Sequence, residues 1–205
     1  MISVVDYGAG NLCSVVNALT QLGYSYRITN KPEDVLEADT VILPGVGAAN
    51  NVMNNLKKLE LIEPIKRYTS DGRPFLGICI GLQILLSTTE EGDTQECLGI
   101  IPGSVQKFSN NIKVPHMGWN QVRQVITHPI FIGIPDSTNF YFVHSYYAIP
   151  QNDKAVIGTT DYSIAFASIL AQDKLIATQF HPEKSGKWGL KLYDNFLRMA
   201  GEKRK

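Results

Sequence analysis

A cysteine between two glycines offers a nucleophile. Residues 77–81 read GICIG, with a strand-like run before them and an apolar helical pattern after them. This is the form of a nucleophile elbow, a sharp strand-to-helix turn that strains the backbone of the nucleophile and lifts it clear of a sheet. Gly77 and Gly81 remove Cβ atoms that would collide there, and the helix N-terminus favours the thiolate of Cys79. The alternative is that Cys79 is a small buried core residue, the usual fate of a free cysteine.

A base for this thiol is available near the C-terminus. Residues 175–183, LIATQFHPE, read as a strand that ends in His181 and Glu183 on either side of Pro182. Residues two apart on an extended segment point the same way, so we expect the Glu183 carboxylate to orient the His181 ring. The ring could then take and return the thiol proton near neutral pH. Alone, the tripeptide fits a solvent loop; with the elbow, it indicates a Cys-His-Glu triad.

Two further glycine loops follow predicted strands. Residues 8–10 (GAG) lack the third glycine of a dinucleotide site because Cys13 takes its place, and residues 44–47 (PGVG) have no Lys-Ser/Thr after them. Both loops are therefore weak candidates for phosphate-binding sites. Both would bring backbone N–H groups to the carboxyl edge of a parallel sheet, where ligands bind, and plain tight turns explain them about equally well.

The histidines predict no metal site and, with the weak glycine loops, no cofactor. They have no acidic or thiol neighbours at ligand spacing. His128 precedes a proline and fits a surface turn. His116 and His144 lie in aromatic-rich segments, where a core role and a role in the wall of a site both stay open.

The elements that must position these groups alternate over the first 90 residues. We expect strands at 2–7, 25–29, 40–44 and 74–78, and helices at 11–23, 48–70 and 80–92, the second interrupted near Pro64. Such alternation favours βαβ units and a parallel sheet covered on both faces.

The second half is β-rich. Strand-like runs extend from residue 99 to 180, with a hairpin turn near Asp173 and Lys174, and a last helix follows at 187–201. Ser185 is expected to cap this helix and Gly201 to end it. We predict one α/β domain over residues 1–205 with an antiparallel annex.

Composition fits an ordinary soluble globular protein. Of the 205 residues 44% are hydrophobic, and 19 basic and 19 acidic residues cancel, which argues against a nucleic-acid partner. No stretch approaches the roughly 18 apolar residues of a membrane span, and the N-terminus lacks a signal-peptide pattern. The three cysteines form no CxxC pair and suggest no disulfide framework. We therefore predict a cytoplasmic protein without a membrane partner.

Several segments, in order along the chain, resemble the class I (triad) glutamine amidotransferases. The likeness to the family is carried by PGVG (44–47), PFLGICIGLQILL (74–86) and QFHPEKSG (179–186). A likeness to one branch, the glutaminase subunits of imidazole glycerol phosphate synthases in histidine biosynthesis, is carried by DYGAGN (6–11), HMGWN (116–120) and FVHSYY (142–147). The resemblance implies a flavodoxin-like three-layer sandwich with a central, mostly parallel sheet and an antiparallel β annex.

The resemblance also implies a reaction. Cys79 would attack the side-chain amide of L-glutamine, release ammonia and leave a γ-glutamyl thioester. His181 would protonate the leaving amine and then activate water, while Glu183 orients its ring. The backbone groups implied in an oxyanion hole are those of Val46, Gly47 and Ile80.

A substrate site follows from the same likeness. The residues it implies in glutamine binding are Gly45, Gln83, Glu91, His144, Ser145 and Tyr146. One of them has independent support, because Gln83 lies four residues after Cys79, one helical turn onward on the same face.

In the family, ammonia serves a partner, a cyclase subunit with a (β/α)8 barrel. Ammonia is mostly protonated in water and then no longer nucleophilic, so a docked complex with an enclosed path is implied. The residues implied on or near that interface are Asn11, Met117, Trp119 and Lys184. Large aromatics dominate interface energetics, which makes Trp119 the best anchor candidate; core packing is its alternative.

Val46 departs from many triad amidotransferases, which carry a second glycine there. The valine peptide is less free to adopt every orientation. It matches the histidine-pathway branch, in which the resemblance implies that the partner makes the oxyanion hole competent. We therefore expect weak glutamine hydrolysis by the isolated chain.

Three alternatives stand beside this interpretation. One is a stand-alone thiol hydrolase of γ-glutamyl compounds, and another is a paralogous subunit that feeds ammonia to a different synthase. The third is a non-catalytic binding subunit, against which the intact set of Cys79, His181 and Glu183 argues.

Overall fold

Parallel strands form one side of the central sheet. The computed structural model describes residues 1–8, 11–92 and 94–204. The parallel strands, in spatial order, are β2 (Tyr26–Thr29), β1 (Ile2–Val5), β3 (Thr40–Leu43), β4 (Phe75–Ile78) and β13 (Leu175–Thr178). Strands β1, β3 and β4 are buried along their whole length. Continuous apolar runs are what a sheet covered on both faces requires.

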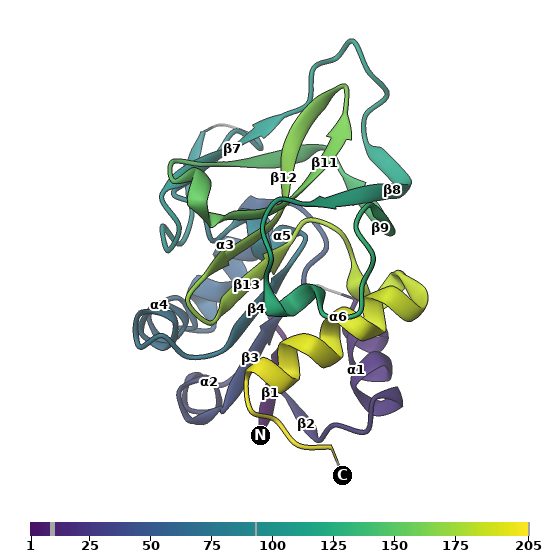
Figure 1. Cartoon of the computed structure of the whole chain (residues 1–205). Helices are drawn as coiled ribbons and strands as arrows, with labels where there is room; N and C mark the ends of the chain where they lie inside the picture. The colour runs from purple at the N-terminus through teal and green to yellow at the C-terminus, as the bar shows by residue number, and fades with distance from the viewer. Residues whose placement is uncertain (9–10, 93, 205) are drawn as a thin grey trace.

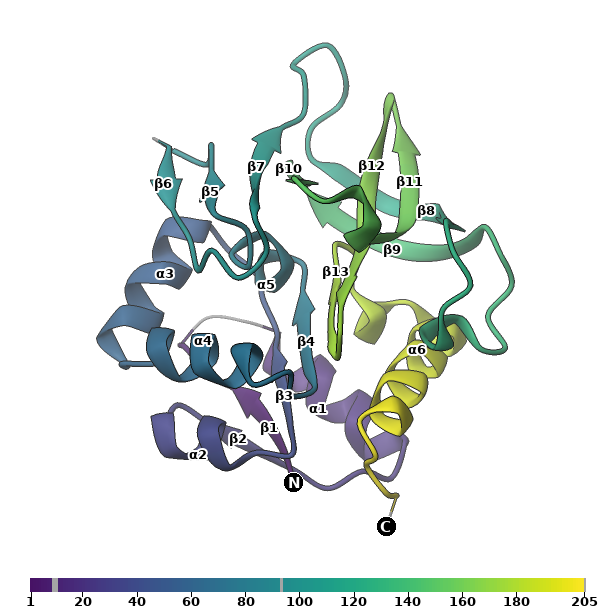
Figure 2. The ribbon, with the colours of Figure 1, turned by 60° about the vertical axis from the view of Figure 1, so that its left-hand side comes forward.

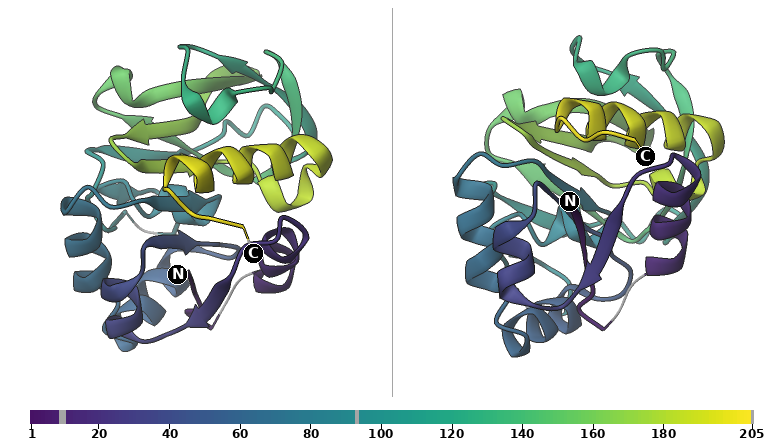
Figure 3. Two further views of the ribbon diagram at one scale, coloured as in Figure 1. Left: turned by 60° about the horizontal axis from the view of Figure 1, so that its bottom comes forward. Right: turned by 90° about the horizontal axis from the view of Figure 1, so that it is seen from below.

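Helices cover both faces of these strands, which gives three layers (Figure 2). One face packs against α2 (Pro32–Glu37), α3 (Ala49–Lys58) and α4 (Ile62–Ser70), and the other against α1 (Leu12–Gln21) and α6 (Gly186–Met199). Figure 3 shows α6, in yellow, near α1, in purple, and the two helices are in contact. In the described part of the chain, no helix combines the length and the apolar character needed to cross a membrane.

A mostly antiparallel annex, in which only the β5–β7 pair is parallel among the described strands, continues the sheet beyond β13 (Figure 1). Its strands are β5 (Thr88–Thr89), β6 (Gln95–Glu96), β7 (Gly103–Lys107), β8 (His116–Gln124), β9 (Thr138–His144), β10 (Tyr146–Pro150), β11 (Val156–Tyr162) and β12 (Ile164–Gln172). Strands β8 and β9 form an antiparallel ribbon that joins the sheet through β11. Short 3₁₀ turns occur at Pro129–Phe131, Asp153–Ala155 and Pro182–Lys184. The predicted fold class, strand runs and Asp173 hairpin are confirmed.

The helix expected at 80–92 is wrong beyond its first turn. Helix α5 covers only Ile80–Gln83. The next segment, 84–87, is almost wholly buried, and its carbonyl groups accept hydrogen bonds from the N–H groups of residues 97–101. Tertiary hydrogen bonds thus replace the helical ones, and the chain runs on into β5.

Three smaller expectations also need correction. The break in the 48–70 helix falls at residues 59–61, and Pro64 lies in the first turn of α4, where its missing N–H costs little. Helix α2 was not expected at all. Ser185 precedes α6 without a side-chain capping bond, because its hydroxyl donates to the His181 carbonyl and accepts from Tyr141 N–H. Gly201, with φ +82°, ends α6 as predicted.

We predict that Gly81→Ala destabilises the fold and disturbs Cys79. A Cβ at Gly81 would lie 2.4 Å from the Leu43 carbonyl oxygen, so β3 and the turn after β4 would have to move apart. Overpacking of this kind costs about 1–3 kcal/mol. Chemical denaturation should show that loss, and peptide mapping should show slower alkylation of Cys79 by iodoacetamide.

Gly72→Ala is the matched control. Its Cβ would meet open space and only its φ of +66° opposes alanine. It should lower stability by about 1 kcal/mol and leave Cys79 alkylation unchanged. Equal alkylation in both variants would contradict the steric argument.

Candidate active site

Cys79 stands on a strained turn between β4 and α5. Its φ of 55° and ψ of −106° are rare for a residue with a side chain. A Cβ at Gly77 would come within 2.8 Å of the Gly81 carbonyl oxygen, so the flanking glycines are sterically required. The elbow geometry expected from GICIG is confirmed, and Cys79 as a residue is 7% exposed.

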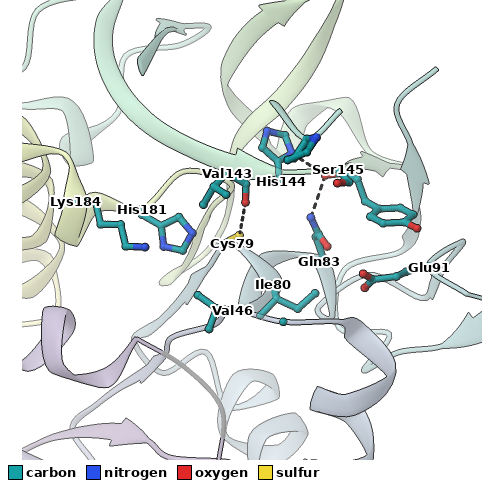
Figure 4. Close-up of a pocket in the computed structure, with 13 residues that line it drawn as sticks. Val46, Cys79, Ile80, Gln83, Glu91, Val143, His144, Ser145, His181 and Lys184 are labelled. Carbon is teal, nitrogen blue, oxygen red and sulfur yellow. Dashed lines mark hydrogen bonds between the residues drawn. The ribbon is translucent and has the colours of Figure 1, made fainter. Parts of the chain in front are cut away.

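His181 and Glu183 form a buried pair beside this thiol. The Nδ1 and Oε1 atoms are 2.7 Å apart, and the side chains are 1% and 2% exposed. Strand β13 ends at Thr178, so the pair is brought together by the 3₁₀ turn at Pro182–Lys184 and not by the expected extended segment. The His181 ring lies next to Cys79 (Figure 4). Its Nε2 has no hydrogen-bond partner among the described residues, which leaves it available to the thiol.

The charges around His181 favour its protonated form. Burial alone would favour the neutral ring, but the interaction with the Cys79 sulfur and the hydrogen bond and charge of Glu183 outweigh that effect. Together they raise the pKa of His181 to about 10. A protonated imidazole beside a sulfur nucleophile is an acid placed to protonate a leaving group.

A cavity of about 370 Å³ opens above these residues (Figure 4). Its lining comprises Val46, Gly47, Cys79, Ile80, Gln83, Glu91, Pro115, Val143, His144, Ser145, Tyr146, His181 and Lys184. Loops after β3 and β4, strand β9 and the turn after β13 therefore converge on one site. In the described residues, no group of three or more His, Cys, Asp or Glu side chains could hold a metal ion.

Most residues expected to bind substrate lie in this lining. Gly45 does not; its built Cβ would lie 1.9 Å from Ile80 Cγ2, so its role is close packing of the 44–47 loop on the elbow. Glu91 accepts a hydrogen bond of 2.6 Å from Ala49 N–H at the start of α3. Ala9 and Gly10 of the first glycine loop lie outside the described residues.

Sequence reasoning missed three residues of the site. The Val143 carbonyl oxygen lies 3.9 Å from Cys79 Sγ, and Pro115 lines the cavity. Gln179 is fully buried and its Nε2 lies 3.8 Å from the sulfur. Gln179 and Val143 both had a signal, because Gln179 stands in the same segment as His181 and Val143 directly precedes His144.

The residues expected at a partner interface are mostly on the surface. Met117 and Trp119 are 60% and 58% exposed on β8, so core packing of Trp119 is wrong. Lys184 is exposed at the edge of the cavity. Asn11 precedes α1 and accepts from the Ser14 hydroxyl at 2.8 Å.

Comparison with known proteins settles the family. A profile of the glutamine amidotransferase class-I family matches residues 3–200. The chain belongs to the class I glutamine amidotransferases. This amidotransferase is 52% identical over 205 residues to the imidazole glycerol phosphate synthase subunit HisH of Dehalococcoides mccartyi strain 195, which covers 100% of both chains. It is 50% identical to HisH of Nitrosococcus oceani, over 98% of each chain.

Solved structures agree on the fold of this amidotransferase. A crystal structure of a glutamine amidotransferase superposes with a TM-score of 0.75 at 18% identity, covering 98% of this chain and 100% of the other. The structure of PurLQS from Thermotoga maritima gives 0.75 at 17% identity, covering 97% of each chain. At such identities the likeness concerns the fold alone.

We predict that Glu183→Gln changes how stability depends on pH. The raised pKa of His181 adds unfolding free energy that is fully present below the unfolded-state value, about 6.5, and is lost as pH rises through about 10. The neutral amide introduced by Glu183→Gln stabilises the protonated His181 ring less than the carboxylate does. The wild type should therefore lose its stability advantage over the variant between about pH 7 and pH 10. Denaturation at a series of pH values measures it. His128→Asn, outside the site, should run parallel to the wild type, and a constant gap for Glu183→Gln would contradict the charge argument.

Proposed function

We propose that the chain is the glutaminase subunit of an imidazole glycerol phosphate synthase. It hydrolyses glutamine to glutamate and ammonia and passes the ammonia to a cyclase subunit in histidine biosynthesis. The observation that carries this proposal is the strained Cys79 beside the buried His181–Glu183 pair. The relatives named HisH, 43–52% identical to this chain, support the choice of synthase.

The geometry supports a thioester mechanism. The sulfur of Cys79 attacks the amide carbon of glutamine, and the oxygen becomes an oxyanion that accepts from Ile80 N–H and from the Val46–Gly47 turn. His181, already protonated, gives its proton to the departing nitrogen, and ammonia leaves a γ-glutamyl thioester. The neutral ring then takes a proton from water, and the hydroxide cleaves the thioester to glutamate. Glu183 holds Nδ1–H throughout, so Nε2 stays turned toward the sulfur.

The cavity supports a small amino acid as substrate. Gln83 and Glu91 supply polar side chains to its lining, and the adjoining 144–146 segment, to which Gln83 is hydrogen-bonded, completes this polar part of the wall. The amide side chain of glutamine would point toward Cys79 and its α-amino and carboxylate groups toward these residues.

The exposed face of β8 supports a docked partner. Met117 and Trp119 project from it, and β9, the other strand of the ribbon, contacts the turn of Lys184. That turn also contacts α1, which Asn11 precedes. We propose that this continuous surface binds a (β/α)8 cyclase as a heterodimer and that docking activates the 44–47 loop. We propose that residues 1–205 form one domain. Because the reaction needs Cys79 as a free thiol, we place the subunit in the cytoplasm, which is reducing.

Cys79→Ala separates the two halves of the reaction. With the cyclase subunit present, glutamine-dependent synthesis of the imidazole product should fall below about one thousandth of wild type, because the nucleophile is gone. Synthesis from ammonium salts should be unchanged. Cys13→Ala, on an exposed thiol, is the control. Retained use of glutamine would refute the mechanism, and failure of any ammonia-dependent product with this cyclase would point to another synthase.

Trp119→Ala should weaken the complex. A central aromatic anchor is worth about 2 kcal/mol or more, so we expect a rise in Kd of about thirtyfold by calorimetric titration with the cyclase subunit. Activation of glutaminase should be lost in parallel at low partner concentration. Ile28→Ala, 48% exposed on β2 at the far edge of the sheet, should bind normally. Equal affinity of the two variants would remove β8 from the interface.

A further inference from the structure

Two buried histidines that the mechanism does not use lie directly opposite each other in the β8–β9 ribbon. His116 pairs with His144 in the strand register, and the two residues are 3% and 5% exposed. His116 Nδ1 and His144 Nε2 are 2.9 Å apart. His116 lies behind the cavity lining and His144 within it.

The ends of this pair fix the direction of every hydrogen bond in it. Asn120 Oδ1 accepts from Gln121 N–H and its Nδ2 donates to Asp161 O, so Nδ2 can only donate to His116 Nε2, 3.2 Å away. At the other end, His144 Nδ1 lies 2.7 Å from Tyr146 O, a carbonyl that can only accept. Both rings must therefore be neutral and carry their proton on Nδ1.

The same carbonyl leads on to the nucleophile. Tyr146 O also accepts from Gln83 Nε2 at 2.9 Å, which fixes the orientation of the Gln83 amide (Figure 4). Gln83 Nε2 donates as well to Gln179 Oε1 at 3.2 Å, and Gln179 Nε2 points at Cys79 Sγ. With its nitrogen occupied twice, Gln83 has its oxygen left to accept from a substrate group.

We propose that Asn120, His116 and Gln179 are positioning residues for glutamine binding. They form one hydrogen-bond chain with His144, Tyr146 O and Gln83. The chain holds the Tyr146 carbonyl in place, and through it the Gln83 amide presents its oxygen to the α-ammonium group of glutamine. This inference deepens the proposed function and rests on it.

The surroundings keep the chain neutral. The His116 ring stacks on Phe142 and Tyr162, with centroids 4.9 and 4.0 Å apart. Burial lowers the pKa of His116 to about 4 and, with the nearby His116 and His181, that of His144 to about 3, although its bond to Tyr146 O opposes this. If either ring were protonated on both nitrogens, one of its N–H groups would face another N–H group. The hydrogen-bond partners and the lowered pKa values therefore both require neutral rings.

His116→Phe tests the chain because it keeps a ring among aromatic neighbours and removes both hydrogen bonds. In the complex with the cyclase subunit, we expect the KM for glutamine to rise about tenfold, with a smaller change in kcat and unchanged synthesis from ammonium salts. Tyr162→Phe is the matched control. The Tyr162 ring stacks on His116, but its hydroxyl donates to Lys113 O, which is not part of the hydrogen-bond chain. It should keep the wild-type KM.

His116→Asn separates positioning from packing. Asparagine can place an amide N–H near the position of Nδ1 and donate to His144, but it loses the ring. It should be less stable to denaturant than His116→Phe and yet have the lower KM, within about threefold of wild type. If KM follows stability instead, the residue only packs and the proposal fails.

A direct measurement needs no variant. A long-range ¹H–¹⁵N spectrum of the wild-type complex should place the proton of both rings on Nδ1, and a proton on Nε2 of either ring would overturn the chain. An error in the proposed function itself would show in a different experiment, as glutamine-dependent synthesis that survives in Cys79→Ala. A normal KM in His116→Phe, with Cys79→Ala inactive, would refute the chain alone.

Discussion

Cys79 occupies a backbone conformation that side chains avoid, and the surrounding chain is built to hold it there. Such a residue costs of order 1–3 kcal/mol unless the neighbouring structure over-determines it. Here its N–H donates to Thr178 O at 2.7 Å, and its carbonyl accepts from Leu82 and Gln83 at the start of α5. Gly81 lies against the Leu43 carbonyl, so no lateral room remains for the turn to relax. The strain is therefore fixed by strands on both sides of β4.

The same packing decides where His181 stands. Strand β13 runs parallel to β4 with Thr178 opposite Ile78, so both chains leave the sheet at one edge. His181 is then tied to β9, because its N–H donates to Tyr141 O and Ser185 Oγ bridges the two segments. The sulfur and the imidazole are held by separate elements that share one sheet edge, which limits how far they can drift apart.

Local patterns predicted the parts of the site that depend on local geometry. The elbow around Cys79 and the His181–Glu183 pair each arise within a few residues, where sterics and spacing are decisive. The end of the helix after Cys79 could not be read from the sequence, because hydrogen bonds from residues 97–101 decide it. The contacts of Gln179 and His116 could not be predicted either, because they form only in the folded protein. Gln179 meets Cys79 across 100 positions of the chain, and His116 meets His144 across 28.

The β8–β9 ribbon joins the proposed partner surface to the candidate active site. Alternate residues of β8 face opposite ways, so Met117 and Trp119 reach the outside while His116 and Asn120 turn inward. Across the ribbon, β9 turns its Val143 carbonyl toward the sulfur. If a partner binds the outer face better in the placement of the ribbon that glutamine also prefers, each ligand strengthens the binding of the other by the same factor. The inner face reaches Gln83 through the Tyr146 carbonyl, so such coupling has a path that leaves the central sheet in place.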